Sequence, residues 1–98
     1  MVFTDEYDFD LLVNEAEKKI IAELEQQLNA HEGDICRCSE CVLDMAAMAL
    51  NAVKPMYRVS LLGSLYAAEA INEESYTKSV RNAVARSIEK VRKNPAHD

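Results

Sequence analysis

The sequence has few of the residues that interrupt regular secondary structure. It contains two glycines, two prolines and no tryptophan in 98 residues. A strand-rich fold needs frequent tight turns, which Gly and Pro commonly supply. Alanine, the strongest helix former, occurs thirteen times instead. We therefore predict an all-α fold of three to four helices, in one domain over residues 1–98 because a chain of this length rarely divides.

Long apolar runs are also missing. No stretch approaches the roughly 20 residues that span a bilayer, and the acidic N-terminus lacks the basic start and apolar stretch of a signal peptide. We therefore expect no membrane insertion and a cytoplasmic location. Hydrophobic residues make up 49% of the chain, which is enough to build a packed core.

Positive charge is scarce overall, and the net charge is −6. A nucleic-acid polymer is an unlikely partner, because binding one requires an excess of Lys and Arg against the phosphates. Residues 1–49 carry twelve acidic against three basic residues, whereas residues 50–98 carry five against eight. Any anionic partner should therefore meet the second half of the chain.

Apolar residues recur at helical spacing near the N-terminus. We predict a first helix that Asp8 or Asp10 caps and that Gly33 stops in a left-handed conformation. Its expected buried face comprises Phe9, Leu12, Val13, Ala16, Ile20, Leu24 and Leu28.

A second helix is predicted from a Ser39 cap to Pro55 and is apolar almost all round. Such a helix must be buried on most sides, which a three-helix layout of this size does not achieve. We therefore expect a partner chain to cover the remainder, in a homodimer.

Pro55 to Val59 should form an extended connector. Ser60 or Ser64 then begins a third helix, and Asn72 caps or renews a last one that runs through Lys93 to the Asn94-Pro95 stop. The expected core face of the last helix is Tyr76, Val80, Ala83, Val84, Ser87, Ile88 and Val91.

The three cysteines, Cys36, Cys38 and Cys41, lie within six positions, and an odd number cannot all pair within one chain. Their C-x-C-x-x-C spacing occurs where a loop enters a helix, whose positive N-terminal end stabilises thiolates. Clustered thiolates favour a soft divalent cation, and we predict zinc. A tetrahedral ion needs a fourth ligand, for which His31, His97, Asp44 or a group of a second chain are candidates.

The three cysteines have three alternative roles besides holding a structural zinc ion. They can serve as small apolar residues without a metal. A redox C-x-x-C pair is disfavoured because no βαβ pattern surrounds it. A catalytic zinc with Glu40 or Asp44 as base is disfavoured because sites made mostly of thiolates usually hold structure, and the zinc-deaminase pattern is missing. We therefore expect no enzyme.

Residues 36–57 read CRCSECVLDMAAMALNAVKPMY and resemble the late competence protein ComFB family. The family pattern is C-x-C-x-x-C-x-x-D-x-x-A-L-A-L-N-x-x-x-P-x-Y, and only Met48, at the first Leu, departs from it. Asn94-Pro95-Ala96-His97 also looks like the family's N-P-x-H ending.

The resemblance implies a small, helical, dimeric regulatory protein with a cysteine-bound zinc. It links the chain to competence and, through some members, to sensing of cyclic dinucleotides such as cyclic di-GMP or cyclic di-AMP, and it does not imply an enzyme. It also places His97 ahead of His31 as the fourth zinc ligand.

A cyclic dinucleotide presents two phosphates and two bases, and a twofold dimer offers each binding element twice. Tyr57 and Arg58 in the connector are candidates to stack on a base and bind a phosphate, with Arg81 or Arg86 nearby. The alternative for the arginines of the last helix is a solvated outer face, and for Tyr57 it is packing. The alternative function is an adaptor that binds an unknown protein partner and no small ligand.

Overall fold

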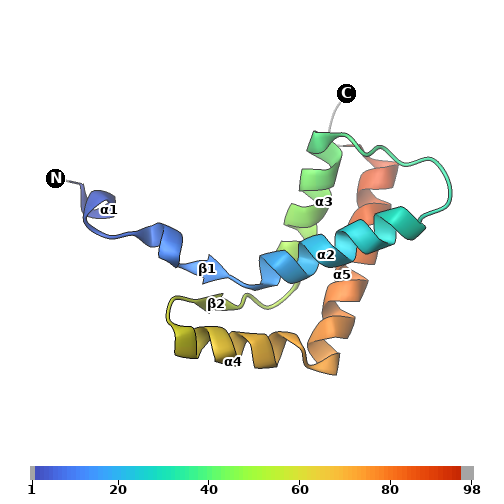
Figure 1. Cartoon of the computed structure of the whole chain (residues 1–98). Coiled ribbons are helices and arrows are strands. Elements are labelled where there is room, and N and C mark those ends of the chain that lie inside the picture. The colour runs from blue at the N-terminus through green and yellow to red at the C-terminus, as the bar shows by residue number, and fades with distance from the viewer. Residues whose placement is uncertain (1, 96–98) are drawn as a thin grey trace.

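A computed structural model of the chain describes residues 2–95. Within that range the fold is mostly helical (Figure 1), as predicted, but it has more elements than expected. In chain order these are α1 (Phe3–Glu6), the 3₁₀ turn η1 (Phe9–Leu11), β1 (Val13–Asn14), α2 (Ala16–Ala30), α3 (Ser39–Ala52), β2 (Tyr57–Arg58), α4 (Leu61–Ile71) and α5 (Glu74–Lys93).

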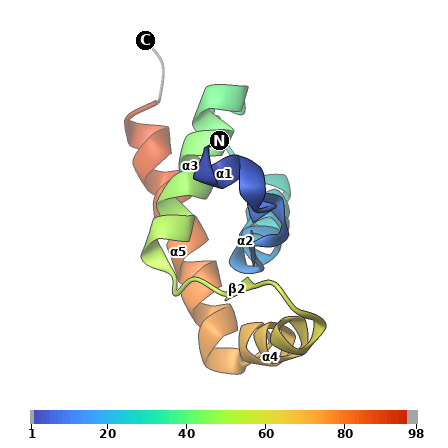
Figure 2. The ribbon, with the colours of Figure 1, turned by 90° about the vertical axis from the view of Figure 1, so that its left-hand side faces the viewer.

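Three helices, α2, α3 and α5, build the core. Helices α3 and α5 lie side by side in opposite directions, and α2 crosses them (Figures 1 and 2). Helix α3 buries Cys41, Met45 and Ala49, and Val53 directly after it is also buried. The start of α3 is thereby placed next to the end of α5.

The predicted core face of the last helix is confirmed, since all seven expected residues are buried. The one polar member, Ser87, donates its hydroxyl hydrogen bond to the carbonyl oxygen of Val84 at 2.9 Å. Tyr76 donates from its phenol to the carbonyl oxygen of Lys54 at 2.7 Å and holds the connector against α5. Burial raises the pKa of Tyr76, so the phenol keeps the proton that it donates.

The predicted start of the first helix is wrong. Helix α2 begins at Ala16, not after Asp8 or Asp10, and Phe9 and Leu12 are each 48% exposed. The side chain of Asp8 instead accepts a bond from the backbone N–H of Asp10, which forms the η1 turn. The later part of the expected face is confirmed, because Ala16, Ile20, Leu24 and Leu28 are buried.

Asn14 explains why the helix begins late. Its Oδ1 accepts hydrogen bonds from the backbone N–H of Ala16 at 3.1 Å and of Met56 at 2.8 Å. The connector is extended, as predicted, and β2 within it pairs antiparallel with β1, with Val13 opposite Arg58. One carboxamide therefore supports the start of α2 and the β1–β2 pairing.

Other predicted boundaries need correction. Ser39 is the first residue of α3, and Cys38 occupies the N-cap position. Asn72 ends α4, and Glu73 is the N-cap of α5. Gly33 does have a positive φ of 113°, but α2 has already ended at Ala30. Of the two predicted starts, Ser60 and Ser64, it is Ser60 that caps α4, because its Oγ accepts a bond from the N–H of Gly63 at 3.0 Å.

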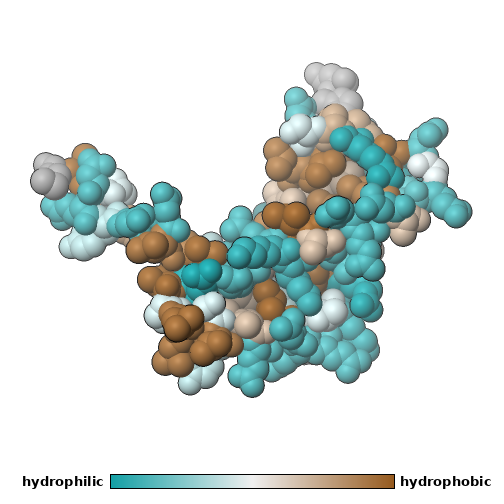
Figure 3. All heavy atoms as spheres, viewed as in Figure 1, coloured by the Kyte–Doolittle hydropathy of each residue, from teal (hydrophilic) through white to brown (hydrophobic). Residues whose placement is uncertain are grey.

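Helix α4 and residues 2–12 lie outside the core. Of α4 only Ala67 is buried, whereas most of its large apolar side chains face solvent. Figure 3 shows hydrophobic surface gathered over α4 and the neighbouring η1–β1 segment. Within residues 2–95, no helix is both long and apolar enough to cross a bilayer.

We predict that Asn14→Ala lowers the free energy of unfolding by about 1–2 kcal/mol, because two backbone donors lose their acceptor. Denaturation with urea, followed by circular dichroism, measures this change. The matched control is Asn82→Ala at an exposed position of α5, which should leave the stability unchanged or slightly higher. Equal stability of both variants would contradict the role of Asn14.

Candidate metal centre

The three cysteines come together at the start of α3. Cys36 lies in the preceding loop and is half-buried, Cys38 is the exposed N-cap residue, and Cys41 is fully buried in the first turn. Their three sulfur atoms all lie within 4.8 Å of one another. The predicted cluster is therefore present in the folded chain.

The cluster suits a thiophilic divalent ion. Zinc–sulfur bonds of about 2.3 Å place the sulfurs of a tetrahedral site about 3.8 Å apart, so these sulfurs need to approach by about 1 Å at most. The start of α3 points its positive end at them, which favours thiolate. Donor type, spacing and local electrostatics all fit a metal ion.

Two kinds of contact hold the loop that carries the cysteines. Ile35 and Cys36 pack against the core. Between the cysteines, Arg37 donates from its guanidinium to the carbonyl oxygen of Leu28 in the last turn of α2. The same carbonyl also accepts the backbone N–H of His31 at 3.3 Å, so the Arg37 contact adds a second bond there and holds the cysteine loop against α2.

Within residues 2–95, no His, Asp or Glu joins the three cysteines as a fourth ligand. His31 follows α2 and is half-buried, and Asp44 lies one turn into α3. His97 lies outside the described residues. The end of α5, which leads to it, lies beside the start of α3 (Figures 1 and 2).

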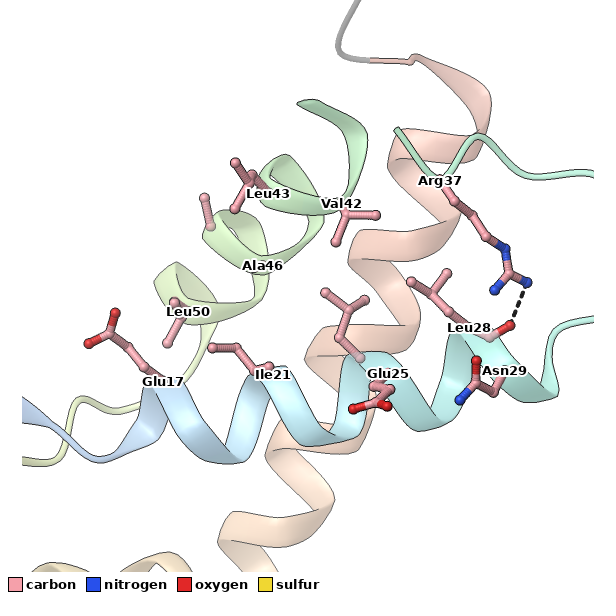
Figure 4. A pocket seen from close by; sticks show the side chains of 12 residues that line it. Glu17, Ile21, Glu25, Leu28, Asn29, Arg37, Val42, Leu43, Ala46 and Leu50 are labelled. Atoms are coloured by element: carbon pink, nitrogen blue, oxygen red, sulfur yellow. Dashed lines mark hydrogen bonds between the residues drawn. The ribbon is translucent and has the colours of Figure 1, made fainter. Parts of the chain in front are cut away.

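An apolar groove runs between α2 and α3, with a volume of about 580 Å³. Ile21 is 57% exposed on its α2 side and Leu43 is 65% exposed on its α3 side. Figure 4 shows Glu17 at one end of the groove and Arg37 at the other. The sequence analysis predicted that part of the apolar surface of the second helix needs a partner chain to cover it. On α3, that exposed apolar surface lines this groove.

Tyr57 and Arg58, the two connector residues predicted to bind an anionic ligand, have different neighbours. Tyr57 is 62% exposed and lines a hollow of about 430 Å³ together with Asn14, Asn51 and other residues. Arg58 is half-buried, and its Nε lies 2.6 Å from Oε1 of Glu15. The guanidinium of Arg58 is thus neutralised within the chain.

The two arginines of α5 are separated as well. Arg81 and Arg86 are five positions apart, which turns them about 140° around the helix. The backbone carbonyl of Arg81 accepts a bond from Gln27 of α2 at 3.0 Å. Arg86 instead lines a hollow of about 290 Å³ between α3 and α5, with Asn51, Ser87 and Lys90 among its neighbours.

Asn51 borders both the Tyr57 hollow and the Arg86 hollow, so these two share one edge. Tyr57 and Arg86 therefore belong to neighbouring surfaces, whereas Arg58 and Arg81 make contacts elsewhere. The sequence analysis did not single out Lys90, which lines the same hollow as Arg86. Its spacing of four residues from Arg86 was the available signal, because such residues share a helix face.

Further along α5, the cations are occupied by an acidic neighbour. Arg92 donates two hydrogen bonds to the Glu89 carboxylate, and Lys93 lies 3.8 Å from it. The Arg92 hydrogen bonds chiefly lower the pKa of Glu89, with smaller contributions from the charges of Lys93 and His31. Arg92 and Lys93 are therefore less available to an anion than Arg86 and Lys90 are.

Comparison with known proteins adds two relationships. The family profile described as late competence development protein ComFB matches residues 13–95. A solved structure of the late competence protein ComFB from Bacillus subtilis is similar, with a TM-score of 0.69 and 25% identity, over 86% of this chain and 91% of that chain. No curated protein matches significantly.

Proposed function

This chain belongs to the late competence protein ComFB family, and we propose that it is a zinc-stabilised, dimeric regulatory protein that binds a cyclic dinucleotide rather than an enzyme. The observation that carries the proposal is the cluster of three sulfur atoms within 4.8 Å at the start of α3. The similar protein from Bacillus subtilis is a late competence protein, which supports a regulatory role.

Zinc is the ion that this donor set favours. Cys36, Cys38 and Cys41 supply three thiolates, and His97 completes the tetrahedron. The position of α5 supports this ligand, because Pro95 ends the described chain two residues before His97 and α5 ends beside α3. Such an ion ties the loop to both helices and supplies structure rather than catalysis.

A second copy of the chain covers the groove between α2 and α3. A twofold dimer sets the same surface against itself and exchanges the two ends of the groove. Glu17 of one copy then lies opposite Arg37 of the other, since these residues stand at opposite ends (Figure 4). The pairing combines burial of Ile21 and Leu43 with complementary charge.

The surface around Asn51 is the proposed place for the cyclic dinucleotide. Tyr57 offers an exposed ring for a base, and Arg86 with Lys90 offers cations for a phosphate. Arg58 and Arg81 remain candidates through a second copy, but within one chain Arg58 already binds Glu15.

That ion pair favours a second candidate function, an adaptor that has the zinc and the dimer but no small ligand. If Arg58 serves only to hold β2 against the start of α2, the connector has a structural role. Titration with the two common cyclic dinucleotides separates the two candidates.

For the metal site, we expect the purified chain to contain about one zinc ion per copy. His97→Ala should weaken zinc retention against a competing chelator by about tenfold or more, and His31→Ala should not. Cys38→Ser gives the reference loss, because it removes a thiolate at an exposed position. Retention unchanged in both Cys38→Ser and His97→Ala would overturn the site.

For the dimer, Leu43→Glu should convert the protein to monomers, because it buries a carboxylate from each copy in the apolar interface. Sedimentation velocity measures the mass. The matched control is Leu61→Glu, at an even more exposed leucine on α4. Glu17→Arg should also weaken the dimer, because it sets a second cation opposite Arg37 of the other copy, and an unweakened dimer in Glu17→Arg would contradict the twofold pairing. Arg37 itself stays unchanged because it holds the cysteine loop against α2.

For the ligand, calorimetry with cyclic di-GMP and cyclic di-AMP should show binding of one of them. Arg86→Ala should weaken it by about ten- to a hundredfold, as expected for a lost charge-assisted hydrogen bond. The control on the same helix is Arg92→Ala, whose guanidinium already binds Glu89.

Arg58 is tested in the same titration with a second pair of variants. If it binds a phosphate, Arg58→Ala weakens binding, whereas Glu15→Gln leaves the guanidinium in place and does not. Wild-type affinity in Arg58→Ala would remove this residue from the ligand site. No binding heat from either nucleotide would favour the adaptor function.

A further inference from the structure

An exposed hydrophobic surface remains that neither the metal nor the groove explains. We name it the α4 patch, and it consists of Leu11, Leu12, Val59, Leu61, Leu62 and Leu65, which are between 48% and 81% exposed. Figure 3 shows hydrophobic side chains gathered there, over α4 and the η1–β1 segment.

Strand pairing joins the two parts of this patch. The β1–β2 register sets Val13 opposite Arg58, and one further step sets Leu12 opposite Val59 on the same face. Ser60 then caps α4, so that Leu61, Leu62 and Leu65 follow directly. Leu61 and Leu65 are one helical turn apart and lie on one face of α4.

The two chain segments that carry the α4 patch contain acidic residues but no basic ones. Residues 2–17 and 59–77 contain no Lys or Arg. Asp10 directly precedes Leu11 and Asp8 lies three positions before it, and Glu69 continues the Leu61–Leu65 face of α4 by one more turn. Arg58, between the two segments, is neutralised by Glu15. The surface is therefore apolar and acidic.

The apolar area and the negative charge of the α4 patch together indicate what kind of partner it binds. Burying a leucine or valine removes on the order of 100 Å² of apolar surface, so the exposed parts of six such side chains offer roughly 400 Å². Phe9 of η1 and Tyr66 of α4 are also exposed, at 48% and 66%, and add roughly 200 Å². A stable interface between two folded proteins needs about 800 Å² per partner, and two acidic copies would also repel each other across this patch. Anionic membranes and nucleic acids are repelled for the same reason.

We infer that the α4 patch binds a basic amphipathic helix of a partner protein, with leucine-type residues on the patch and Lys or Arg toward Asp8, Asp10 and Glu69. A single helix matches the available apolar area, and its cations match the acidic border. This site is separate from the metal centre and from the groove between α2 and α3.

The probe is a synthetic amphipathic helix of about fifteen residues, with Leu at helical spacing and Lys on the other face. Fluorescence anisotropy measures its binding to the full-length protein. We expect the double variant Leu62→Ser with Leu65→Ser to bind it at least tenfold more weakly than the wild type. A peptide with Glu in place of every Lys should also bind at least tenfold more weakly, and added salt should weaken binding of the Lys peptide.

The matched control is Val2→Ser, because Val2 is 62% exposed on the N-terminal arm outside the α4 patch. Equal weakening by Val2→Ser, or wild-type affinity of the double variant, would overturn the inference. So would loss of the dimer in the double variant, which would make the patch an interface between copies. Zinc content and mass measured on the same samples test the proposed function separately.

Discussion

The antiparallel packing of α3 on α5 is the constraint on which the other features depend. Helix α3 meets α5 with small and medium side chains, Cys41, Met45 and Ala49, against the valine-rich face of α5. This contact sets the start of one helix beside the end of the other. It brings the start of α3 to the end of α5, and it brings Asn51 at the other end of α3 to the middle of α5.

Features that depend on short-range patterns were predicted from the sequence. The buried face of α5 follows from a periodicity within one helix, and the cysteine cluster follows from three positions at a single loop-to-helix junction. Ser60 was one of the two serines predicted to begin α4, and the bond it makes as a cap spans only three residues. In each case the chain determines the contact within one or two helical turns.

Features that depend on distant partners were missed. The apolar spacing from Phe9 onward suits a helix, but Asn14 bonds to Met56, 42 positions away, and pairing with β2 keeps Val13 and Asn14 extended. A long-range contact thus outweighs local helical preference. The same holds for Arg58, whose availability for a ligand depends on Glu15, 43 positions earlier. No local pattern indicates either pairing.

The net charge of −6 is a poor guide to what this chain binds, because its charges are segregated by the fold. Asp8, Asp10 and Glu69 lie in the segments that carry the α4 patch, and a partner there should bring cations. Arg86 and Lys90 stand together between α3 and α5, and a partner there must bring negative charge. Electrostatic screening acts over about 8–10 Å at physiological salt, which is shorter than the 47 Å length of the molecule. Each surface therefore selects its partner by its own local charge, independently of the total.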